Sequence, residues 1–299
     1  MSLYLISIIS NISLISFIAL SAYLVLIVGE VSFGQQAFFG IGAYISAIAT
    51  SLFNLHLIFA IVISIIIGAV VAALLARLTL KLSGVFFSIA TLAFAELFRL
   101  SMLQVRYTTE VNGRSSGPDG PEGFQNIRWI FENNISPLTF MIILLIILFC
   151  ILVLFIIAER SHFFKAARLV GEDPILAQSQ GLNPEAYRAK MICISGALAA
   201  LGGALFAHHS SYIEPSMFGV MLGVHSLAYT IIGGLGTPIG PILGVIFDIG
   251  LLESVRSIAS YRMIVFGGIV VLLLIILPQG FLNPRFVTKL KIKLGIYRV

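Results

Sequence analysis

Charged residues are scarce in this chain: Asp, Glu, Lys and Arg make up only 10% of its 299 residues, whereas 59% are hydrophobic. A soluble domain of this size could not bury so much apolar surface, so the composition excludes that class and favours a polytopic membrane protein. The apolar runs are long and unbroken, which argues against a porin-type barrel with short alternating strands. We therefore predict an all-α fold, a bundle of transmembrane helices.

Motifs that carry chemistry are scarce as well. Two cysteines, Cys150 and Cys193, are too few for a disulfide framework. The sequence has no Walker A loop to hold nucleotide phosphates, and no His-Glu-x-x-His or Cys-x-x-Cys motif to hold zinc. The net charge of +5 is spread over several loops, which does not favour a nucleic-acid partner. We expect no catalytic residue, no metal and no cofactor bound by this chain, and hence no enzyme.

The apolar runs predict about 8–10 spans within a single domain, 1–299. The two shortest of these runs, 220–235 and 241–254, fall well below the ~20 residues that cross a bilayer as a helix, so we expect short or broken helices near 220–254. The Gly- and Pro-rich segment 105–136 is expected to form an outer loop of turns. The predicted spans are 3–28, 37–53, 57–76, 85–104, 137–158, 191–207, 220–235, 241–254 and 261–277.

The positive charges predict how the chain is oriented. They gather near Arg77 and Lys81, in the segment 159–190, and in a basic tail at 283–299. Such regions face the cytosol by the positive-inside rule, and an even number of predicted spans separates them. We therefore expect a multi-pass protein of the cytoplasmic (inner) membrane, with the N-terminus outside and the C-terminus in the cytosol.

The polar segment 159–190 predicts a short helix outside the bilayer. Asp173 is a good N-cap residue, Pro174 suits the first helical position, and Gly181 suits the left-handed residue that closes a helix. Asn183-Pro184 repeats the start signal for the next helix. A short helix bounded in this way, between two spans, indicates a cytosolic loop that a partner holds.

Small residues recur every four positions in the span 191–207, at Ser195, Ala199, Gly203 and Ala207. This spacing lets helix backbones approach closely in lipid. It predicts close packing within one subunit, with a seam between subunits or a pathway lining as alternatives.

Charged residues inside predicted spans are candidates for function, because burying a charge in lipid is costly. Glu96 and Arg99 are spaced to pair on one helix face. Asp248 has no basic residue one turn away in the sequence. These carboxylates leave a second function open, a stand-alone secondary transporter or channel that uses Asp248 or Glu96. A membrane-embedded enzyme is a third reading, for which no convincing pair of catalytic groups is seen.

Several motifs are spread along the chain: Gly29-x-x-Ser32-x-Gly34-Gln35 followed by Phe38-x-Gly40-x-Gly42-Ala43-Tyr44, the run Thr91 to Glu96, Gly117-x-Asp119-Gly120, Ala167-Arg168 with Glu172-Asp173 and Ala177-x-x-x-Gly181, the turn Gly233-Gly234-Leu235-Gly236-Thr237-x-x-Gly240-Pro241, and Pro278-x-Gly280. Together they resemble the permease subunits of branched-chain amino acid ABC importers of the LivM type, over about 25–282. Three features depart from that pattern: Ile175-Leu176-Ala177 stands where the coupling motif usually begins Glu-Ala-Ala, Pro174 stands where an acidic residue is frequent, and Gly171 stands where an Arg is common.

The resemblance implies a permease subunit that translocates branched-chain (hydrophobic) amino acids in an ATP-driven importer. It implies a second permease subunit, two ATPase subunits that bind ATP-Mg, an extracytoplasmic solute-binding protein and the surrounding lipid bilayer as partners. The helix at 172–181 would dock on a separate ATPase subunit. Relatives in the wider family carry urea or short amides, so the resemblance does not fix one solute.

Two groups of site residues follow from the resemblance. The expected ATPase-docking residues are Arg168, Glu172, Asp173, Ile175, Leu176, Ala177 and Gly181. The residues expected in the translocation path or its gate are Gly40, Gly42, Thr91, Glu96, Gly233, Gly234 and Gly236.

Overall fold

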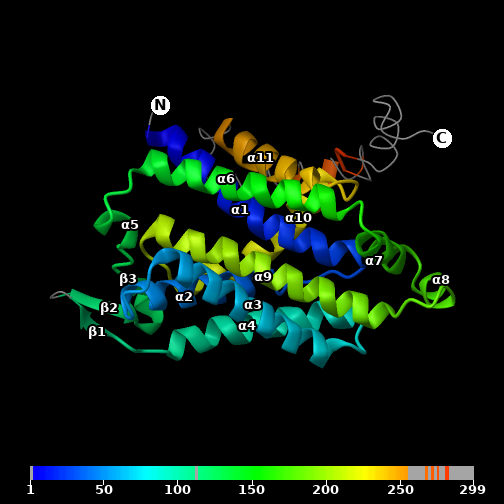
Figure 1. Ribbon diagram of the computed structural model, residues 1–299, viewed down its shortest axis with the longest axis horizontal. Helices are drawn as coiled ribbons and strands as arrows, with labels where there is room; N and C mark the ends of the chain where they lie inside the picture. The colour runs from blue at the N-terminus through cyan, green and yellow to red at the C-terminus, as the bar shows by residue number, and fades with distance from the viewer. Residues whose placement is uncertain are drawn as a thin grey trace.

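The computed structural model describes residues 3–111, 114–254, 267–268, 271–272, 275 and 280–282. They form a bundle of long helices that lie side by side, which confirms the all-α bundle (Figure 1). In the described part of the chain, α1, α3, α4, α6 and α9 are each long and apolar enough to cross a membrane. The main helices are α1 (Leu3–Ile27), α2 (Gln35–Ser51), α3 (Leu57–Thr79), α4 (Val85–Gln104), α6 (Pro137–Ala158), α9 (Pro184–Ser210), α10 (Val220–Gly233) and α11 (Ile239–Ser254).

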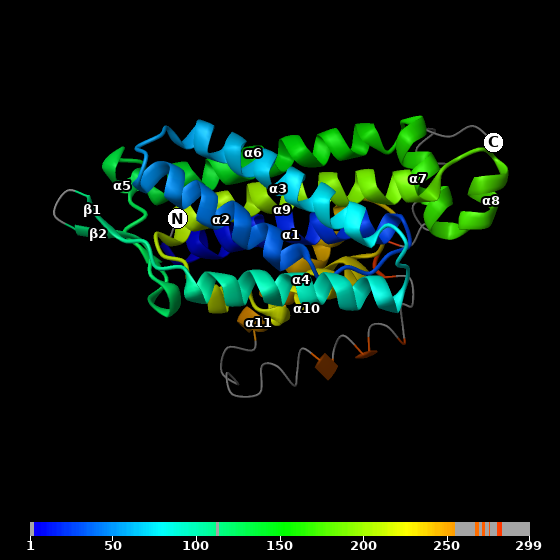
Figure 2. The same cartoon turned by 90° about the horizontal axis from the view of Figure 1, so that it is seen from below.

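Short elements mark the two ends of the bundle (Figures 1 and 2). One end, here called the α8 end, carries α7 (His162–Glu172) and α8 (Pro174–Ser179). The opposite end, here called the sheet end, carries a three-stranded antiparallel sheet in the order β1-β2-β3. Its elements are β1 (Thr109–Val111), β2 (Arg114–Pro118), η1 (Gly120–Glu122), β3 (Phe124–Gln125) and α5 (Trp129–Glu132), while η2 (Pro215–Phe218) leads into α10.

The sheet corrects the expectation that 105–136 consists of turns. The backbone N–H of Tyr107 donates to the carbonyl oxygen of Pro118 at 2.8 Å. Phe124 and Ile213 exchange two backbone hydrogen bonds, of 2.7 and 3.1 Å, which tie the sheet to the segment before η2. The strands hold only two to five residues each, too few to show the alternating pattern by which strands are recognised in a sequence.

Helix α9 lies at the centre of the bundle and packs against α1, α2 and α3. At Gly203 a Cβ atom would lie 1.7 Å from the carbonyl oxygen of Phe39 in α2, and at Gly42 it would lie 2.0 Å from that of Ala200. A Cβ at Gly196 would lie 2.3 Å from the Cβ of Ala72 in α3 and 3.0 Å from the carbonyl oxygen of Gly68. These contacts confirm the packing predicted from the small-residue spacing, within one chain.

The two short helices near 220–254 are confirmed as well, with 14 residues in α10 and 16 in α11. They form a hairpin whose backbones nearly touch, since a Cβ at Gly233 would lie 1.8 Å from the carbonyl oxygen of Gly240. The N–H groups of Phe281 and Leu282 donate to the last carbonyls of α10, at 2.9 and 3.0 Å. Backbone groups at a helix end that the helix itself leaves unpaired are thereby satisfied.

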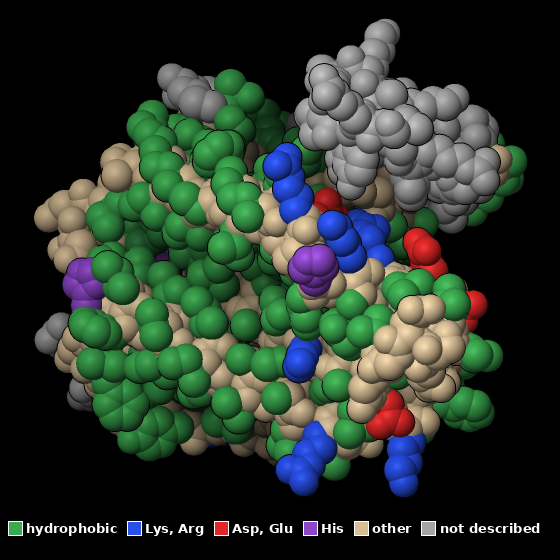
Figure 3. Space-filling view, turned by 45° about the vertical axis from the view of Figure 1, so that its right-hand side comes forward, with side chains coloured by type: hydrophobic (Ala, Val, Ile, Leu, Met, Phe, Trp, Pro, Cys, Tyr) green, Lys and Arg blue, Asp and Glu red, His purple; other side chains and the backbone are tan. Residues whose placement is uncertain are grey.

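The surface of the bundle is mostly apolar. Large hydrophobic side chains stand exposed along α3, α4 and α6, among them Ile66, Phe86 and Phe149. In Figure 3 hydrophobic side chains cover the flank, while the Lys, Arg, Asp and Glu side chains in view gather toward the α8 end. An apolar flank suits contact with lipid, and the helices satisfy their backbone N–H and C=O groups internally, as the bilayer core requires. The chain is therefore a multi-pass membrane protein.

The close contact at Gly203 makes a direct prediction. Gly203→Ala should lower the free energy of unfolding by about 1–3 kcal/mol, because the added methyl group overlaps the Phe39 carbonyl. Gly250→Ala is the matched control, since a Cβ at Gly250 meets no atom within 4 Å. The measurement is the midpoint of thermal unfolding in detergent. Equal midpoints for the two variants would contradict the packing described here.

Candidate functional site

The start of α8 is fixed by the predicted cap. Oδ1 of Asp173 accepts hydrogen bonds from the N–H groups of Ile175 and Leu176, at 3.0 and 2.9 Å. Pro174 occupies the first position of the helix, where its missing N–H is not needed. Both features confirm the start read from the sequence.

The end of α8 is fixed by the predicted glycine. Gly181 has a φ of +78°, in the left-handed region, and its N–H donates to the carbonyl oxygen of Gln178 at 2.9 Å. The next N–H, of Leu182, donates to Ala177 at 3.0 Å, which completes a Schellman motif. No atom lies within 4 Å of a Cβ built at Gly181, so a side chain there would be strained by conformation rather than by crowding.

The two faces of α8 differ sharply. Ile175 is 79% exposed and Leu176 is 46% exposed, so two large apolar side chains stand on the outer face of a short polar loop. Ala177 is fully buried, in a helix that packs against α7 and α9. It was expected among the docking residues, but the structure places it on the inner face of α8. Glu172, Asp173 and Gly181 remain exposed at the two ends.

Helix α7 was missed in the sequence. Its N-cap is Ser161, whose Oγ accepts a hydrogen bond from Phe164 N at 3.3 Å. Its buried residues, Phe164, Ala167 and Val170, lie three positions apart. A serine cap followed by this spacing is the signal that could have revealed an amphipathic helix.

The last turn of α7 touches the end of α1 backbone to backbone. A Cβ at Gly171 would lie 2.1 Å from the carbonyl oxygen of Ile27, and one at Gly29 would lie 2.8 Å from that of Gly171. Gly29 also has a φ of +78°. The departure from the family pattern at Gly171 thus has a physical reason, because no arginine side chain could leave the backbone toward α1 there.

Arg168 points into the protein and joins four elements. Its Nη2 donates to the Tyr23 hydroxyl at 2.7 Å and pairs with Oε1 of Glu159 at 2.5 Å. Its Nη1 donates to the carbonyl oxygen of Leu235, in the turn between α10 and α11, at 2.9 Å. Tyr23 donates to the same Glu159 oxygen at 2.6 Å. Arg168 therefore links α7 to α1, to the end of α6 and to the α10–α11 turn, rather than facing outward like Ile175.

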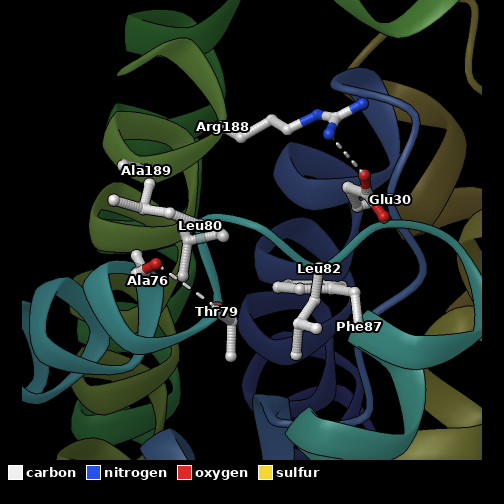
Figure 4. A pocket seen from close by; sticks show the side chains of 9 residues that line it. Glu30, Ala76, Thr79, Leu80, Leu82, Phe87, Arg188 and Ala189 are labelled. Carbon is white, nitrogen blue, oxygen red and sulfur yellow. Dashed lines mark hydrogen bonds and ion pairs between the residues drawn. The ribbon is translucent and has the colours of Figure 1, made fainter. Parts of the chain in front are cut away.

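A second buried network holds the other loops of the α8 end. Oε1 of Glu30, which is only 2% exposed, lies 3.1 Å from Nη1 of Arg188 at the start of α9. Its Oε2 accepts the N–H of Gly84 at 2.9 Å. Figure 4 shows Arg188 reaching toward Glu30 beside a small pocket with largely apolar walls, including Leu82 and Phe87. Burial raises the pKa of Glu30, against the opposing effects of the Gly84 hydrogen bond and the Arg188 charge.

The expected path residues do not form one site. Gly40 makes room for aromatic rings, since its Cβ would lie 2.4 Å from Phe98 and 2.9 Å from Phe218. Gly42 faces α9 instead. Thr91 is buried, and its Oγ1 accepts the N–H of Phe33 at 3.1 Å.

The remaining path residues lie elsewhere. Glu96 pairs with Arg99 on a partly exposed face of α4, which confirms the predicted pairing, with Nε to oxygen distances of 3.0 and 3.1 Å. Gly233, Gly234 and Gly236 lie at the α10–α11 turn. Asp248 is buried in α11, separate from Glu96 on α4.

A helical core closed by small residues, an apolar flank and a short capped helix at one end define a polytopic membrane protein. The chain matches the family model "Branched-chain amino acid transport system / permease component" over residues 4–277. It therefore belongs to this family of transport permeases, the membrane components of multi-component ABC systems.

Individual relatives agree with the family. The chain is 30% identical over 287 residues to the LivM permease protein of Escherichia coli (strain K12), covering 89% of this chain and 67% of the relative. It is 28% identical over 288 residues to LivM of Salmonella typhimurium, with the same two shares. It is 27% identical over 172 residues to LivH of Escherichia coli (strain K12), covering 55% of each chain. No solved structure matches the chain.

The Glu30–Arg188 pair predicts a difference between two substitutions. Glu30→Ala should lower the free energy of unfolding by about 3–5 kcal/mol, because Arg188 loses its counter-charge and the Gly84 N–H loses its buried acceptor. Glu30→Gln also removes the charge but should cost less, since its side-chain oxygen can still accept a hydrogen bond from the Gly84 N–H. The midpoints of thermal unfolding in detergent test this order, and a Gln variant as unstable as the Ala variant would refute it.

The raised pKa of Glu30 predicts that the stability of the folded state depends on pH. The folded state binds the Glu30 proton more tightly than the unfolded state, so this stabilisation is complete below the ordinary pKa and is lost as pH rises through the folded pKa. Relative to Glu30→Gln, the wild type should therefore gain stability as pH falls through that folded pKa. A difference that stays constant with pH would show that burial does not shift this carboxyl group.

Proposed function

We propose that this chain is the transmembrane permease subunit of an ATP-driven importer of branched-chain amino acids. The observation that carries the proposal is α8, a helix capped at both ends that exposes Ile175 and Leu176. Because the sequence has no nucleotide-binding motif, ATP-driven transport would require an ATPase on another chain, and an exposed apolar helix face suits such a partner. The printed name of LivM, a high-affinity branched-chain amino acid transport permease, supports the same function.

Helix α8 docks on a separate ATPase subunit. Ile175 and Leu176 supply the apolar contact, Glu172 and Asp173 flank it with negative charge, and Ala177 supports the helix from within. ATP-Mg is bound by the ATPase and not by this chain. The full importer contains a second permease subunit, two ATPase subunits and an extracytoplasmic solute-binding protein.

The α8 end faces the cytosol, and the sheet end faces outward, in the cytoplasmic (inner) membrane. The charge pattern supports this orientation, since Lys81 lies in the loop between α3 and α4, at the same end as Arg188 and the basic segment 159–190. The N-terminus then lies outside. The basic tail at 283–299, expected in the cytosol, is outside the described residues.

Movement of α8 reaches the membrane helices through α7. The backbone contact between Gly171 and Gly29 transmits it to α1, and Arg168 transmits it to the α10–α11 turn through Leu235. Arg168 is therefore a positioning residue, which couples the docked helix to the transmembrane helices, while its neighbours on α8 make the contact.

A stand-alone secondary transporter is the second candidate, and the burial of Asp248 in α11 is the observation that favours it. A buried carboxylate can carry a coupling proton across the membrane. Uptake into proteoliposomes separates the two functions. Uptake that requires ATP and the partner subunits supports the importer, and uptake by this chain alone under a proton gradient overturns it.

The docking surface can be tested by assembly. A tagged chain carrying Ile175→Glu and Leu176→Glu should lose most of the co-purifying ATPase, because two charges replace the apolar contact. Phe131→Glu is the matched control, since Phe131 is also an exposed apolar residue but lies in α5 at the sheet end. Full recovery of the ATPase with the α8 variant would place the dock elsewhere on the chain.

The coupling role of Arg168 predicts a loss of transport without a loss of assembly. Arg168→Met should lower the amount of amino acid imported per ATP hydrolysed by roughly tenfold or more, because α7 loses three hydrogen bonds. Lys165→Met is the control, an exposed cation on the same helix. An unchanged ratio of import to hydrolysis in the Arg168 variant would contradict the route through α7.

A further inference from the structure

Helix α2 begins inside the bundle rather than at its end. The residue pair that anchors its start is Phe33 and Thr91, joined by the 3.1 Å hydrogen bond to Thr91 Oγ1. Thr91 lies six residues after Val85, the first residue of α4, and so about 9 Å into that helix at 1.5 Å per residue. The first turn of α2, with Gln35 and Gln36, therefore lies at a depth where water is scarce.

Polar side chains from four helices meet around this turn, and all are fully buried. Most of them are satisfied. Ser195 Oγ donates to Gln35 Oε1 at 3.0 Å, and Thr230 Oγ1 donates to the carbonyl oxygen of Ala19 at 2.9 Å. The group consists of Ser21 of α1, Gln35 and Gln36 of α2, Ser195 of α9, and Ser226 and Thr230 of α10.

In this group Gln35 leaves only its Nε2 unpaired among the described residues, whereas Gln36 leaves its whole carboxamide unpaired. Gln36 is fully buried, yet among the described residues neither its Nε2 nor its Oε1 has a hydrogen-bond partner. An unpaired carboxamide in an apolar interior is costly, and a methionine of similar length would avoid that cost. The packing of the bundle therefore does not explain why a glutamine occupies this position.

The carboxamide lies against Gly223 in the first turns of α10. A Cβ at Gly223 would be 2.1 Å from Oε1 and 3.1 Å from Nε2 of Gln36, so the amide fills the space that a side chain would take. The opposite face of α10 is loosely packed, with Met221 and Val224 exposed. Among the described residues that face is uncovered, so a movement of α10 away from α2 would meet no described element there and would break the Thr230 bond to Ala19.

The chemistry of this group suits a zwitterion. A carboxamide offers two N–H donors and one oxygen acceptor and carries no charge of its own. Its donors can bind a carboxylate, its oxygen can bind an ammonium group, and the N-terminal end of α2 adds a partial positive charge for the carboxylate. The low dielectric at this depth strengthens both of these hydrogen bonds.

We propose that Gln36 is a solute contact within the membrane, where its carboxamide binds the head group of an α-amino acid when α10 moves away from α2. Gly223 allows α10 to close over the amide again after the solute leaves. This inference rests on the proposed function and deepens it, since it names the residue that recognises the amino acid backbone. It also gives the α10–α11 hairpin, tied to Arg168 through Leu235, a role as the moving wall of the path.

The test uses the complete importer in proteoliposomes, with ATP inside, solute-binding protein outside and radiolabelled L-leucine as the probe. Gln36→Met should lower leucine uptake per complex by roughly tenfold, the effect of losing one or two hydrogen bonds to the solute, while assembly stays normal. Ser10→Ala is the matched control, because Ser10 is also fully buried with an unpartnered hydroxyl among the described residues, near the start of α1.

Gly223→Ala tests the same contact from the α10 side, and it applies if the Gln36→Met complex fails to assemble. Gly223→Ala should displace the carboxamide and lower uptake, and an assembled Gly223→Ala complex with wild-type uptake overturns the proposal. Wild-type uptake in an assembled Gln36→Met complex overturns it as well, and leaves the importer function standing. A wild-type complex without ATP-driven uptake overturns the proposed function, and this inference with it.

Discussion

The rest of the structure depends on how closely α9 approaches α2 and α3. Between Gly203 and Phe39, and between Gly42 and Ala200, the backbones lie so near that no side chain fits. In lipid, where apolar surface gains little from burial, close van der Waals packing of this kind holds helices together. Because α9 begins just after α8, this contact also fixes the base of α8 against the bundle.

The bundle has two closely packed units, the helices around α9 and the α10–α11 hairpin. The hairpin keeps an exposed face on α10 and meets α2 through Gly223. Besides its contact with α9, the α8 end reaches α1 through Gly171 and Gly29, and the α10–α11 turn through Arg168. In the proposed importer, a movement of α8 would therefore reach the hairpin as well as the core, as an alternating pathway needs.

The features that could be predicted from the sequence are the local ones. The caps of α8 follow from Asp173, Pro174 and Gly181 because a helix end is set by residues within one turn of it. The network of Arg168 could not be predicted, because its partners Tyr23 and Leu235 lie far away in the chain. Likewise, the path glycines share a family pattern, but Gly40 meets the rings of Phe98 and Phe218, whereas Gly42 and Gly233 meet the backbones of Ala200 and Gly240.

The hydrogen bonding of two adjacent glutamines could not be predicted from the sequence. Gln35 and Gln36 are equally buried, yet one is held by Ser195 and the other has no partner among the described residues. A carrier driven by protons needs an ionisable side chain that meets the solute or the proton in the path. Glu96 is already paired with Arg99 on a partly exposed face, which leaves the buried Asp248 of α11 as the candidate for that role. A permease driven by ATP on another subunit has no such need. A neutral amide can then bind both charges of an amino acid without bringing a buried charge of its own, which is why Gln36 fits the importer better than a proton-coupled carrier.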